Sequence, residues 1–276
     1  MRVLSCFDWI SVGYQALKNI WVKDVEYYAS EIDKYAIQIA KKNHPDIIHI
    51  GDIVNVKWWD YDLIIWWSPC QGFSNQGKRL NFEDPRSKLF FEFVRIVKES
   101  KPRYFMLENV KMKKEWVDII TSYLFDIEPV LINSSKFTAQ NRERLYWIGE
   151  LQDDWSYKRV KIWEIKDRGI KFEEIYKKWD KSNISDKAIQ YALNAKFKSD
   201  RVIKLPKDKA NTLLAWSRKT YEYNWVYRKL TPEEMEILQG LPVWYTEWVS
   251  NTQRYKMLGN AWTLPVIEFI FKHFKF

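Results

Sequence analysis

Residues 62–87 read DLIIWWSPCQGFSNQGKRLNFEDPRS and contain the change of pattern that indicates the fold. An apolar run ends abruptly, two tryptophans follow, and Pro69-Cys70 then opens a polar, basic loop. Short apolar runs bounded by turn residues are typical of buried strands. The apolar positions of residues 87–100 recur at helical spacing. The stretch therefore predicts a strand, a loop and a helix, the beginning of a βαβ unit.

The same alternation runs through the first 150 residues. Short apolar runs predict strands at 2–7, 25–30, 46–50, 61–65, 103–109, 127–132 and 144–149. Helical spacing predicts helices at 33–43 and 87–100. Strands that alternate with helices form a parallel sheet covered by helices. We therefore expect an α/β fold, with a doubly wound Rossmann-like sheet built by residues 1–150.

The rest of the chain divides in two. Residues 151–227 are charged and aromatic and lose the alternation, which predicts a smaller second domain over 151–252. Within it, 228–243 regains order, because Thr231 is a helix N-cap, Pro232 suits the first helical position and Gly240 suits the stop. The segment 253–276 ends in an amphipathic helix, LPVIEFIFKHF, and is expected to return to the first domain.

Composition excludes several classes of protein. No apolar run is long enough to span a bilayer, and the first residues lack a signal-peptide pattern. Cys6 and Cys70, the two cysteines, form neither a disulfide framework nor a zinc site, and the three histidines are scattered. We therefore expect no metal, no membrane and a cytoplasmic, reducing setting.

The excess positive charge lies mostly in one internal segment. Residues 151–227 carry 18 Lys and Arg against 11 Asp and Glu, a balance of +7 within a total of +9. Such a segment suits contact with a polyanion, although a solvated lysine-rich surface would have the same composition.

Chemically active residue types follow each predicted strand. Ligands of a doubly wound sheet bind beyond the carboxyl ends of its strands. There the chain offers a turn with Gly13, then Glu31, Asp52, Cys70 and the pair Glu108-Asn109. An acidic residue closing the second strand suits ribose hydroxyls, so a nucleoside cofactor is indicated. The dinucleotide fingerprint G-x-G-x-x-G is absent, which favours S-adenosylmethionine over NAD.

These motifs, in this order, resemble the cytosine-5 DNA methyltransferase family. The matching strings are FDWISVG, SEID, GDI, SPCQGFS, LENV, QNRERLYW, RKLTPEEMEILQGLP and QRYKMLGNA. The resemblance covers about residues 1–150 and 228–276. The segment 151–227 matches only in position, as the variable part of the family's target-recognition domain. Pro-Cys alone is a weak signal, whereas the joint order of the strings is a strong one.

The resemblance implies a covalent mechanism. Cys70 would be the nucleophile that adds to C6 of cytosine, because a thiolate is strongly nucleophilic and can leave again. Glu108 would be the carboxyl beside N3, and Arg142 and Arg144 would hold the cytosine carbonyl and organise the site. Cys70 could instead be an inert buried thiol, but its place behind a strand and before a polar loop favours a reactive one. Cys6 is interpreted as a core residue.

The resemblance also assigns ligand contacts. The S-adenosylmethionine pocket would comprise Phe7, Asp8, Trp9, Ile10, Gly13, Glu31, Ile32, Asp52, Ile53, Ser68, Leu89, Asn260 and Ala261. Contacts with double-stranded DNA would come from Gln71, Ser74, Lys78, Arg79, Arg86, Gln140, Lys158, Arg159, Lys161, Arg201 and Lys204. The target base would be flipped out of the duplex. A monomer of bacterial or phage origin is expected, with a restriction endonuclease as a possible partner.

Two alternatives remain open from the residues alone. One is the tRNA-cytosine branch of the same family, although PCQGFS is more similar to the DNA enzymes. The other is a non-catalytic DNA-binding relative. The recognised DNA sequence does not follow from residues 151–227.

Tryptophan is abundant where the family has glycine. The chain has 16 Trp and 8 Gly, whereas an average glycine content of about 7% would give about 19. Members of the family have glycine at the positions of Trp9, Trp21, Trp66, Trp67, Trp244 and Trp248, whereas Trp147 and Trp262 fit as tryptophan. A UGA codon that means glycine in the source, read as tryptophan, would produce this pattern. A genuinely tryptophan-rich protein is the alternative. We expect positive or strained φ at one or more of Trp9, Trp66 and Trp67. Trp66 and Trp67 are expected to lie at the end of the fourth strand.

Overall fold

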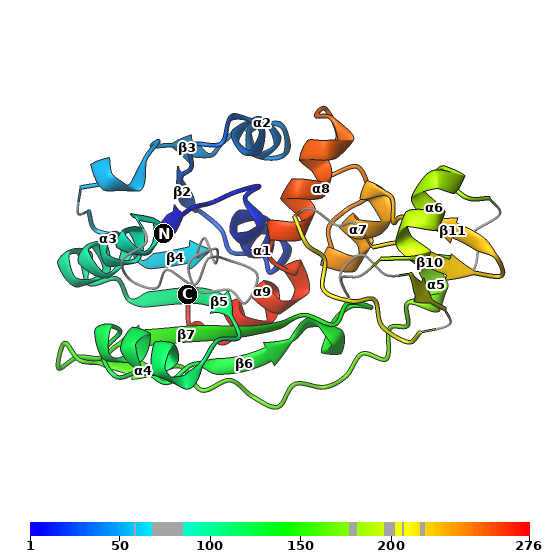
Figure 1. Ribbon diagram of the computed structural model, residues 1–276. Helices are drawn as coiled ribbons and strands as arrows, with labels where there is room; N and C mark the ends of the chain where they lie inside the picture. Colours follow the sequence, from blue (N-terminus) through cyan, green and yellow to red (C-terminus); the bar gives the residue numbers. More distant parts are fainter. Residues whose placement is uncertain (58, 68–84, 177–180, 196–201, 206, 216–218) are drawn as a thin grey trace. The chain divides into compact units, whose positions relative to one another are not determined.

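The computed structural model describes residues 1–57, 59–67, 85–176, 181–195, 202–205, 207–215 and 219–276, with the side chains of 85–88 excepted. The chain forms two compact units (Figure 1). Unit 1 comprises Met1–Asn133, Glu143–Glu164 and Leu264–Phe276, and unit 2 comprises Ser134–Arg142 and Ile165–Thr263.

Unit 1 is built on an eight-stranded sheet. Its strands are β1 (Arg2–Cys6), β2 (Glu26–Ser30), β3 (Ile48–His49), β4 (Leu63–Trp67), β5 (Tyr104–Val110), β6 (Val130–Asn133), β7 (Glu143–Leu151) and β8 (Tyr157–Arg159). Their order is β3-β2-β1-β4-β5-β7-β6, with β8 paired to β7. The first five strands are mutually parallel, and β7 is antiparallel to its neighbours β5, β6 and β8. The seven predicted strands and the doubly wound α/β class are confirmed.

The strand order reverses between β1 and β4. From β1 the chain first builds outward through β2 and β3, and then returns to place β4 and β5 on the other side. Strands buried on both faces are expected to be continuously apolar, as Leu63, Ile64 and Ile65 of β4 are. In such sheets the reversal marks the place where ligands bind, beyond the carboxyl ends of the strands. We call this end of the parallel strands the carboxyl edge.

The helices of unit 1 are α1 (Val12–Asn19), α2 (Lys34–Asn43), α3 (Pro85–Ser100), α4 (Lys114–Tyr123) and α9 (Leu264–Phe271), with the 3-10 turn η1 (Ile53–Asn55). The predictions at 33–43 and 87–100 are confirmed by α2, which Asp33 caps through the N–H groups of Tyr35 and Ala36, and by α3. The C-terminal helix is confirmed as α9, which packs against α1. None of the described helices has the length and apolar character needed to cross a bilayer.

Unit 2 has a smaller three-stranded sheet and its own helices. The strands are β9 (Ile203–Lys204), β10 (Tyr221–Tyr223) and β11 (Val226–Arg228), and the helices are α5 (Glu173–Tyr176), α6 (Asp186–Leu193), α7 (Pro232–Gln239) and α8 (Asn251–Asn260), with η3 at Ser134–Lys136. Helix α7 has the predicted boundaries, since Thr231 and Glu234 form a reciprocal capping box and Gly240 ends it at φ 71°.

The compact units differ in their bounds from the domains expected from sequence. Residues 151–164 belong to unit 1, where β8 extends the large sheet, and 253–263 belong to unit 2, where they form most of α8. Ser134–Arg142 also lies in unit 2. Which functional role each part has is a prediction taken up under the proposed function.

Candidate functional site

The turn after β1 is held by a buried carboxylate. Asp8 accepts hydrogen bonds from the hydroxyl groups of Ser11 and Tyr27, the latter at 2.7 Å, and is itself buried. Burial raises the pKa of Asp8, and the hydroxyl donors oppose that rise. Asp8 was predicted to contact the cofactor, and in this structure its carboxylate shapes the turn. The contacts of Ser11 and Tyr27 with Asp8 were not predicted. The two residues follow Asp8 by 3 and 19 positions, and the sequence alone does not show that their hydroxyl groups reach its carboxylate.

Glu31 ties the end of β2 to the same turn. Its carboxylate accepts the backbone N–H of Trp9 at 3.0 Å and the N–H groups of Ile32 and Asp33, both at 2.8 Å. Burial raises the pKa of Glu31, and these three donors counteract it by stabilising the charged form. The side chain of Ile32 is exposed. Glu31 therefore joins the carboxyl ends of β1 and β2, the place where its predicted ribose contact would be made.

Asp52 lies beyond β3 at the same edge. Its carboxylate caps η1 through the N–H of Val54 at 3.2 Å, while Ile53 is buried. Gly51, just before it, has φ 75° and accepts the Ser30 hydroxyl at 2.8 Å. Three of the predicted acidic positions thus follow β1, β2 and β3 in turn. Gly13 is buried in the first turn of α1, and Leu89 of α3 is partly buried against the core.

Three indoles occupy the junction between β1 and β4. Trp9 has φ 57°, as expected for a glycine position, and its ring stacks on Trp67 with centroids 5.8 Å apart. Trp66 and Trp67 end β4 in regular parallel pairing with β5, as predicted for their place, and neither is among the residues with positive φ. Trp66 is buried between Phe7 and Phe93, and its indole N–H has no hydrogen-bond partner among the described residues. The strained backbone is therefore at Trp9 alone of the three.

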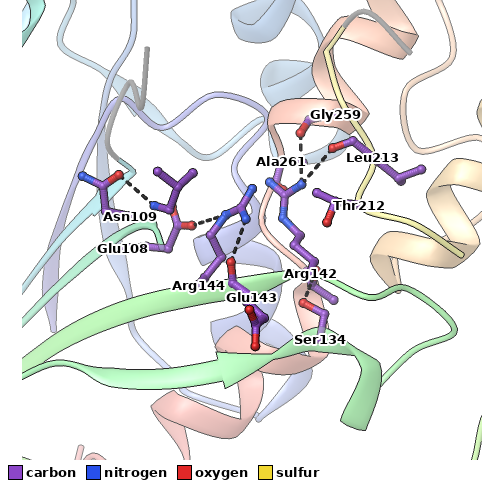
Figure 2. A network of polar contacts seen from close by, with 12 residues as sticks. Glu108, Asn109, Ser134, Arg142, Glu143, Arg144, Thr212, Leu213, Gly259 and Ala261 are labelled. Carbon is purple, nitrogen blue, oxygen red and sulfur yellow. Dashed lines mark hydrogen bonds and ion pairs between the residues drawn. The ribbon is translucent and has the colours of Figure 1, made fainter. Parts of the chain in front are cut away.

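Glu108 and Arg144 form a buried ion pair at the end of β5. Arg144 Nε lies 2.9 Å from Glu108 Oε1 (Figure 2), and the side chains of Glu108 and Arg144 are 3% and 14% exposed. The sheet explains the contact, because Val110 of β5 pairs with Arg144 of β7, which places the guanidinium near Glu108 two residues earlier. The guanidinium also donates to the Glu143 carbonyl at 2.8 Å. Sequence reasoning selected both residues, and the structure brings them together.

Arg142 has a different environment, inside unit 2. Its guanidinium donates to three backbone carbonyls, those of Leu213, Gly259 and Ala261, each at 3.2 Å (Figure 2). A Cβ at position 259 would lie 2.1 Å from the backbone of Leu214, so glycine permits this close approach. Arg142 therefore fastens the 213–215 segment to the end of α8. Asn260 and Ala261, predicted for the cofactor pocket, also lie in unit 2.

Arg142→Met should mainly reduce stability. Three buried carbonyls would be left without charge-assisted donors, and we expect the free energy of unfolding of the protein to fall by about 3 kcal/mol. Urea unfolding followed by near-ultraviolet circular dichroism would measure the change. An unfolding free energy within about 0.5 kcal/mol of the parent would contradict the structural role.

Gln140 is also an internal residue of unit 2. Its amide donates to the Leu238 carbonyl at 3.2 Å and to Gln239 Oε1 at 3.1 Å, and it accepts the N–H of Leu213 at 3.1 Å. The side chain is fully buried. It was predicted to contact DNA, but its hydrogen-bonding groups are engaged within the unit, so it is not retained as a DNA contact.

The remaining predicted residues are exposed or lie outside the described part. Lys158 and Arg159 on β8 and Lys161 are exposed in unit 1, and Lys204 on β9 is exposed in unit 2. Outside the described residues lie Ser68, Cys70, Gln71, Ser74, Lys78, Arg79 and Arg201, together with the side chain of Arg86.

Cys6 is the described free cysteine and matches its interpretation as a core residue. Its side chain is fully buried in β1. Burial raises the pKa of the Cys6 thiol well above its ordinary value, and Asp8 adds to the rise. A thiol in this state is a poor nucleophile, because the thiolate is the reactive form.

Comparison with known proteins gives a consistent result. The model of the C-5 cytosine-specific DNA methylase family matches residues 1–201 and 160–275. The chain is 30% identical over 279 residues to the type II methyltransferase M1.ScrFI of Lactococcus lactis subsp. cremoris, covering 88% of this chain and 70% of that protein. It is also 30% identical to the type II methyltransferase M.NlaX of Neisseria lactamica, over 90% of this chain and 88% of the relative.

The fold has a solved counterpart. The structure of the Entamoeba histolytica methyltransferase EhMeth superposes with a TM-score of 0.77 at 16% identity, covering 99% of this chain and 97% of that one. At this identity the likeness concerns the fold. The family match and the two relatives decide the membership: the chain belongs to the C-5 cytosine-specific DNA methylase family.

Proposed function

We propose that this protein is a DNA (cytosine-5-)-methyltransferase that uses S-adenosylmethionine. The observation that carries the proposal is the buried Glu108–Arg144 pair at the end of β5. Trp67, the last residue of β4, pairs with Glu108 in the sheet, and the chain continues from Trp67 through Ser68-Pro69 to Cys70. A carboxyl group held by a cation thus lies beside the strand that leads to the candidate nucleophile.

The proposed reaction assigns a distinct role to each residue. The Cys70 thiolate forms a bond to C6 of a flipped cytosine, and the ring electrons move toward C5. The Glu108 carboxyl gives a proton to N3 as negative charge develops there and takes it back when the adduct collapses, and Arg144 fixes its position. S-Adenosylmethionine would supply the electrophilic methyl group that C5 accepts, and its sulfur would leave with the electron pair as S-adenosylhomocysteine. A base then removes the C5 proton, the electrons expel the Cys70 thiolate, and 5-methylcytosine is released.

The donor set at the carboxyl edge fits a nucleoside cofactor. Glu31 has one carboxylate oxygen with a single described N–H donor, that of Trp9, which leaves capacity for a ribose hydroxyl. Asp52 and the buried Ile53 follow the neighbouring strand and would contact the adenine. No glycine-rich pyrophosphate cradle accompanies them in the sequence, which supports S-adenosylmethionine rather than a dinucleotide.

Double-stranded DNA is the proposed substrate, recognised by the variable segment 151–227. Its charge balance of +7 suits phosphate contacts. We further propose that the protein acts as a monomer, with the target cytosine flipped out of the helix. The endonuclease partner expected from sequence is part of the same proposal.

Neutralising the exposed cations should weaken the salt dependence of DNA binding. Each DNA phosphate that Lys158, Arg159, Lys161 or Lys204 no longer neutralises should reduce the slope of log K against log salt by about 0.9. Fluorescence anisotropy with a labelled duplex between low and moderate salt would measure the slope. Glutamine at Lys41 and Lys98, exposed on α2 and α3, is the matched control and should leave it unchanged. An unchanged slope in the variant with all four cations replaced by glutamine would place the DNA elsewhere.

The function itself is tested by methyl transfer to defined substrates. Purified protein with labelled S-adenosylmethionine should transfer methyl groups to double-stranded DNA, and sequencing that detects 5-methylcytosine should report the target site. Transfer to tRNA alone would favour the tRNA branch. DNA binding without transfer to either substrate would favour the non-catalytic relative.

A further inference from the structure

Positive φ is concentrated on tryptophan in this protein. Among the described residues, 13 non-glycine positions have positive φ, and six of these are tryptophan: Trp9, Trp21, Trp155, Trp225, Trp244 and Trp248. A bulky side chain rarely occupies this region, which glycine enters without steric cost. The six φ values lie between 57° and 82°, the same region as Gly51, Gly169 and Gly240 at 68° to 75°.

The ends of α1 and α7 allow a comparison within one chain. Helix α7 ends with the N–H of Gly240 bonded to the Ile237 carbonyl and the N–H of Leu241 bonded to Glu236. Helix α1 ends with the same pair of bonds, from Trp21 to Lys18 and from Val22 to Leu17. This is the Schellman motif, whose left-handed residue is usually glycine. Trp21, at φ 65°, thus occupies the position that Gly240 occupies in α7.

Two hairpins also have tryptophan at a turn position that favours glycine. In the β10–β11 hairpin, Tyr223 pairs with Val226, so Asn224 and Trp225 form a two-residue loop with φ 49° and 65°. Positive φ at both positions defines a type I′ turn, for which Asn-Gly is the preferred sequence. In the β7–β8 hairpin, Trp155 is the last residue of a three-residue loop and has φ 64°, again the glycine position.

The other three tryptophans also lie in tight loops. Trp244 is the third residue of a turn closed by the N–H of Tyr245 and the Pro242 carbonyl, and φ 70° there is the type II requirement for glycine. Trp9 is the second residue of a turn closed by Ser11 and Asp8, where positive φ again favours glycine. Trp248, at φ 82°, lies shortly before the N-cap of α8.

At five of the six positions the indole is exposed, so packing there does not compensate for the conformational cost, whereas Trp9 is buried and stacks on Trp67. Trp21 and Trp225 are 85% and 83% exposed, and Trp155, Trp244 and Trp248 are exposed as well. By contrast, Trp147 is fully buried with ordinary φ, and its indole N–H donates to Thr121 Oγ1 at 2.9 Å. The six tryptophans with positive φ therefore differ from Trp147 in backbone conformation, and five of them differ from it in burial as well.

We propose that positions 9, 21, 155, 225, 244 and 248 are glycine positions of this fold, and that the protein made in its own cell carries glycine there. The source would read as glycine a codon that the printed sequence renders as tryptophan. The backbone adds positions 155 and 225 to those the sequence pattern suggested. It gives no such support at Trp66 and Trp67, which lie in regular strand conformation.

One tryptic peptide tests the proposal directly. Cleavage after Arg144 and Lys158 releases residues 145–158, LYWIGELQDDWSYK, which contain both Trp147 and Trp155. In protein isolated from the organism that encodes it, fragmentation mass spectrometry should find tryptophan at 147 and glycine at 155. Peptide 220–228 should likewise carry Asn-Gly at 224–225. Tryptophan at 155 and 225 in the native peptides would overturn the proposal.

Recombinant variants of the printed chain give an independent readout. Trp21→Gly should raise Tm by about 2–4 °C, because it removes a left-handed conformation that L side chains disfavour. Trp21→Ala removes the same exposed indole but keeps the Cβ, so it should gain less. Trp163→Gly is the matched control, since Trp163 is 74% exposed without positive φ, and it should not raise Tm. Equal Tm for Trp21→Gly and Trp21→Ala would contradict a glycine requirement.

Discussion

Cys70→Ala is expected to lower kcat for methyl transfer by about 10⁴-fold or more, the scale of losing a covalent nucleophile. Alanine cannot add to C6 of cytosine, so the ring remains a poor nucleophile at C5. Affinity for DNA should change little, because the covalent bond forms only after the base is bound. Initial rates of labelled methyl transfer and duplex binding by anisotropy would measure the two quantities separately.

Cys6→Ala is the matched thiol control for this experiment. Cys6 is buried in β1 with a raised thiol pKa, so it cannot substitute as the nucleophile. Its replacement should cost about 1 kcal/mol of stability and preserve kcat. DNA containing 5-fluorocytosine sharpens the contrast, since fluorine at C5 cannot leave as a proton does. The parent and Cys6→Ala should form a stable adduct, and an adduct in Cys70→Ala would remove Cys70 from the mechanism.

The sheet could be predicted because its strands have a recognisable sequence pattern. The central parallel strands are buried on both faces, so a strand such as β4 has a short apolar run, Leu63–Ile65, bounded by polar residues. The helices were less evident. Helix α4 carries Val117, Ile119 and Ile120, which favour strands, and α1 has Gly13 in its first turn. Both form because tertiary packing outweighs weak intrinsic propensity.

The site divides along similar lines. Glu108 and Arg144 were selected by motif, and antiparallel register then brought their side chains together. The motifs do not show which of their side chains are buried and bonded within the protein. Gln140 lies in QNRERLYW together with Arg144, yet its amide links the segment at residue 213 to α7 within unit 2. A sequence gives the type of a polar residue, whereas hydrogen-bond partners 73 or 98 residues away decide whether it is available to a ligand.

Domain bounds show the same limit. The loss of strand–helix alternation suggested a second domain that begins at residue 151, but Tyr157–Arg159 pairs with β7 as part of the large sheet. Three-residue strands carry too little periodicity to be recognised. The glycine-like tryptophans were partly visible in composition. The two hairpin positions required the backbone, because Asn224-Trp225 is a turn signal only when the second residue is glycine.

Glu108→Gln and Arg144→Met should separate catalysis from stability at the buried pair. Glu108→Gln keeps the shape of the side chain but removes the carboxyl that stabilises charge at N3. We expect kcat to fall by about 10²–10⁴-fold with a smaller effect on stability. Arg144→Met instead leaves a carboxylate that is only 3% exposed without this cation, and the free energy of unfolding should fall by about 3–5 kcal/mol.

The double variant identifies the cause of each loss. In Glu108→Gln/Arg144→Met no buried charge of the pair is left alone, so stability should recover in part relative to Arg144→Met, while kcat stays low. Lys111→Met, which breaks the exposed pair with Glu143 at 3.1 Å, is the matched control and should cost less than about 1 kcal/mol with kcat preserved. Urea unfolding and methyl-transfer rates on the same preparations supply both measurements. If Glu108→Gln retains kcat within tenfold, the pair is structural and another group stabilises the base. The stability loss in Arg144→Met would still be observed in that case, so the structural and catalytic roles are tested separately.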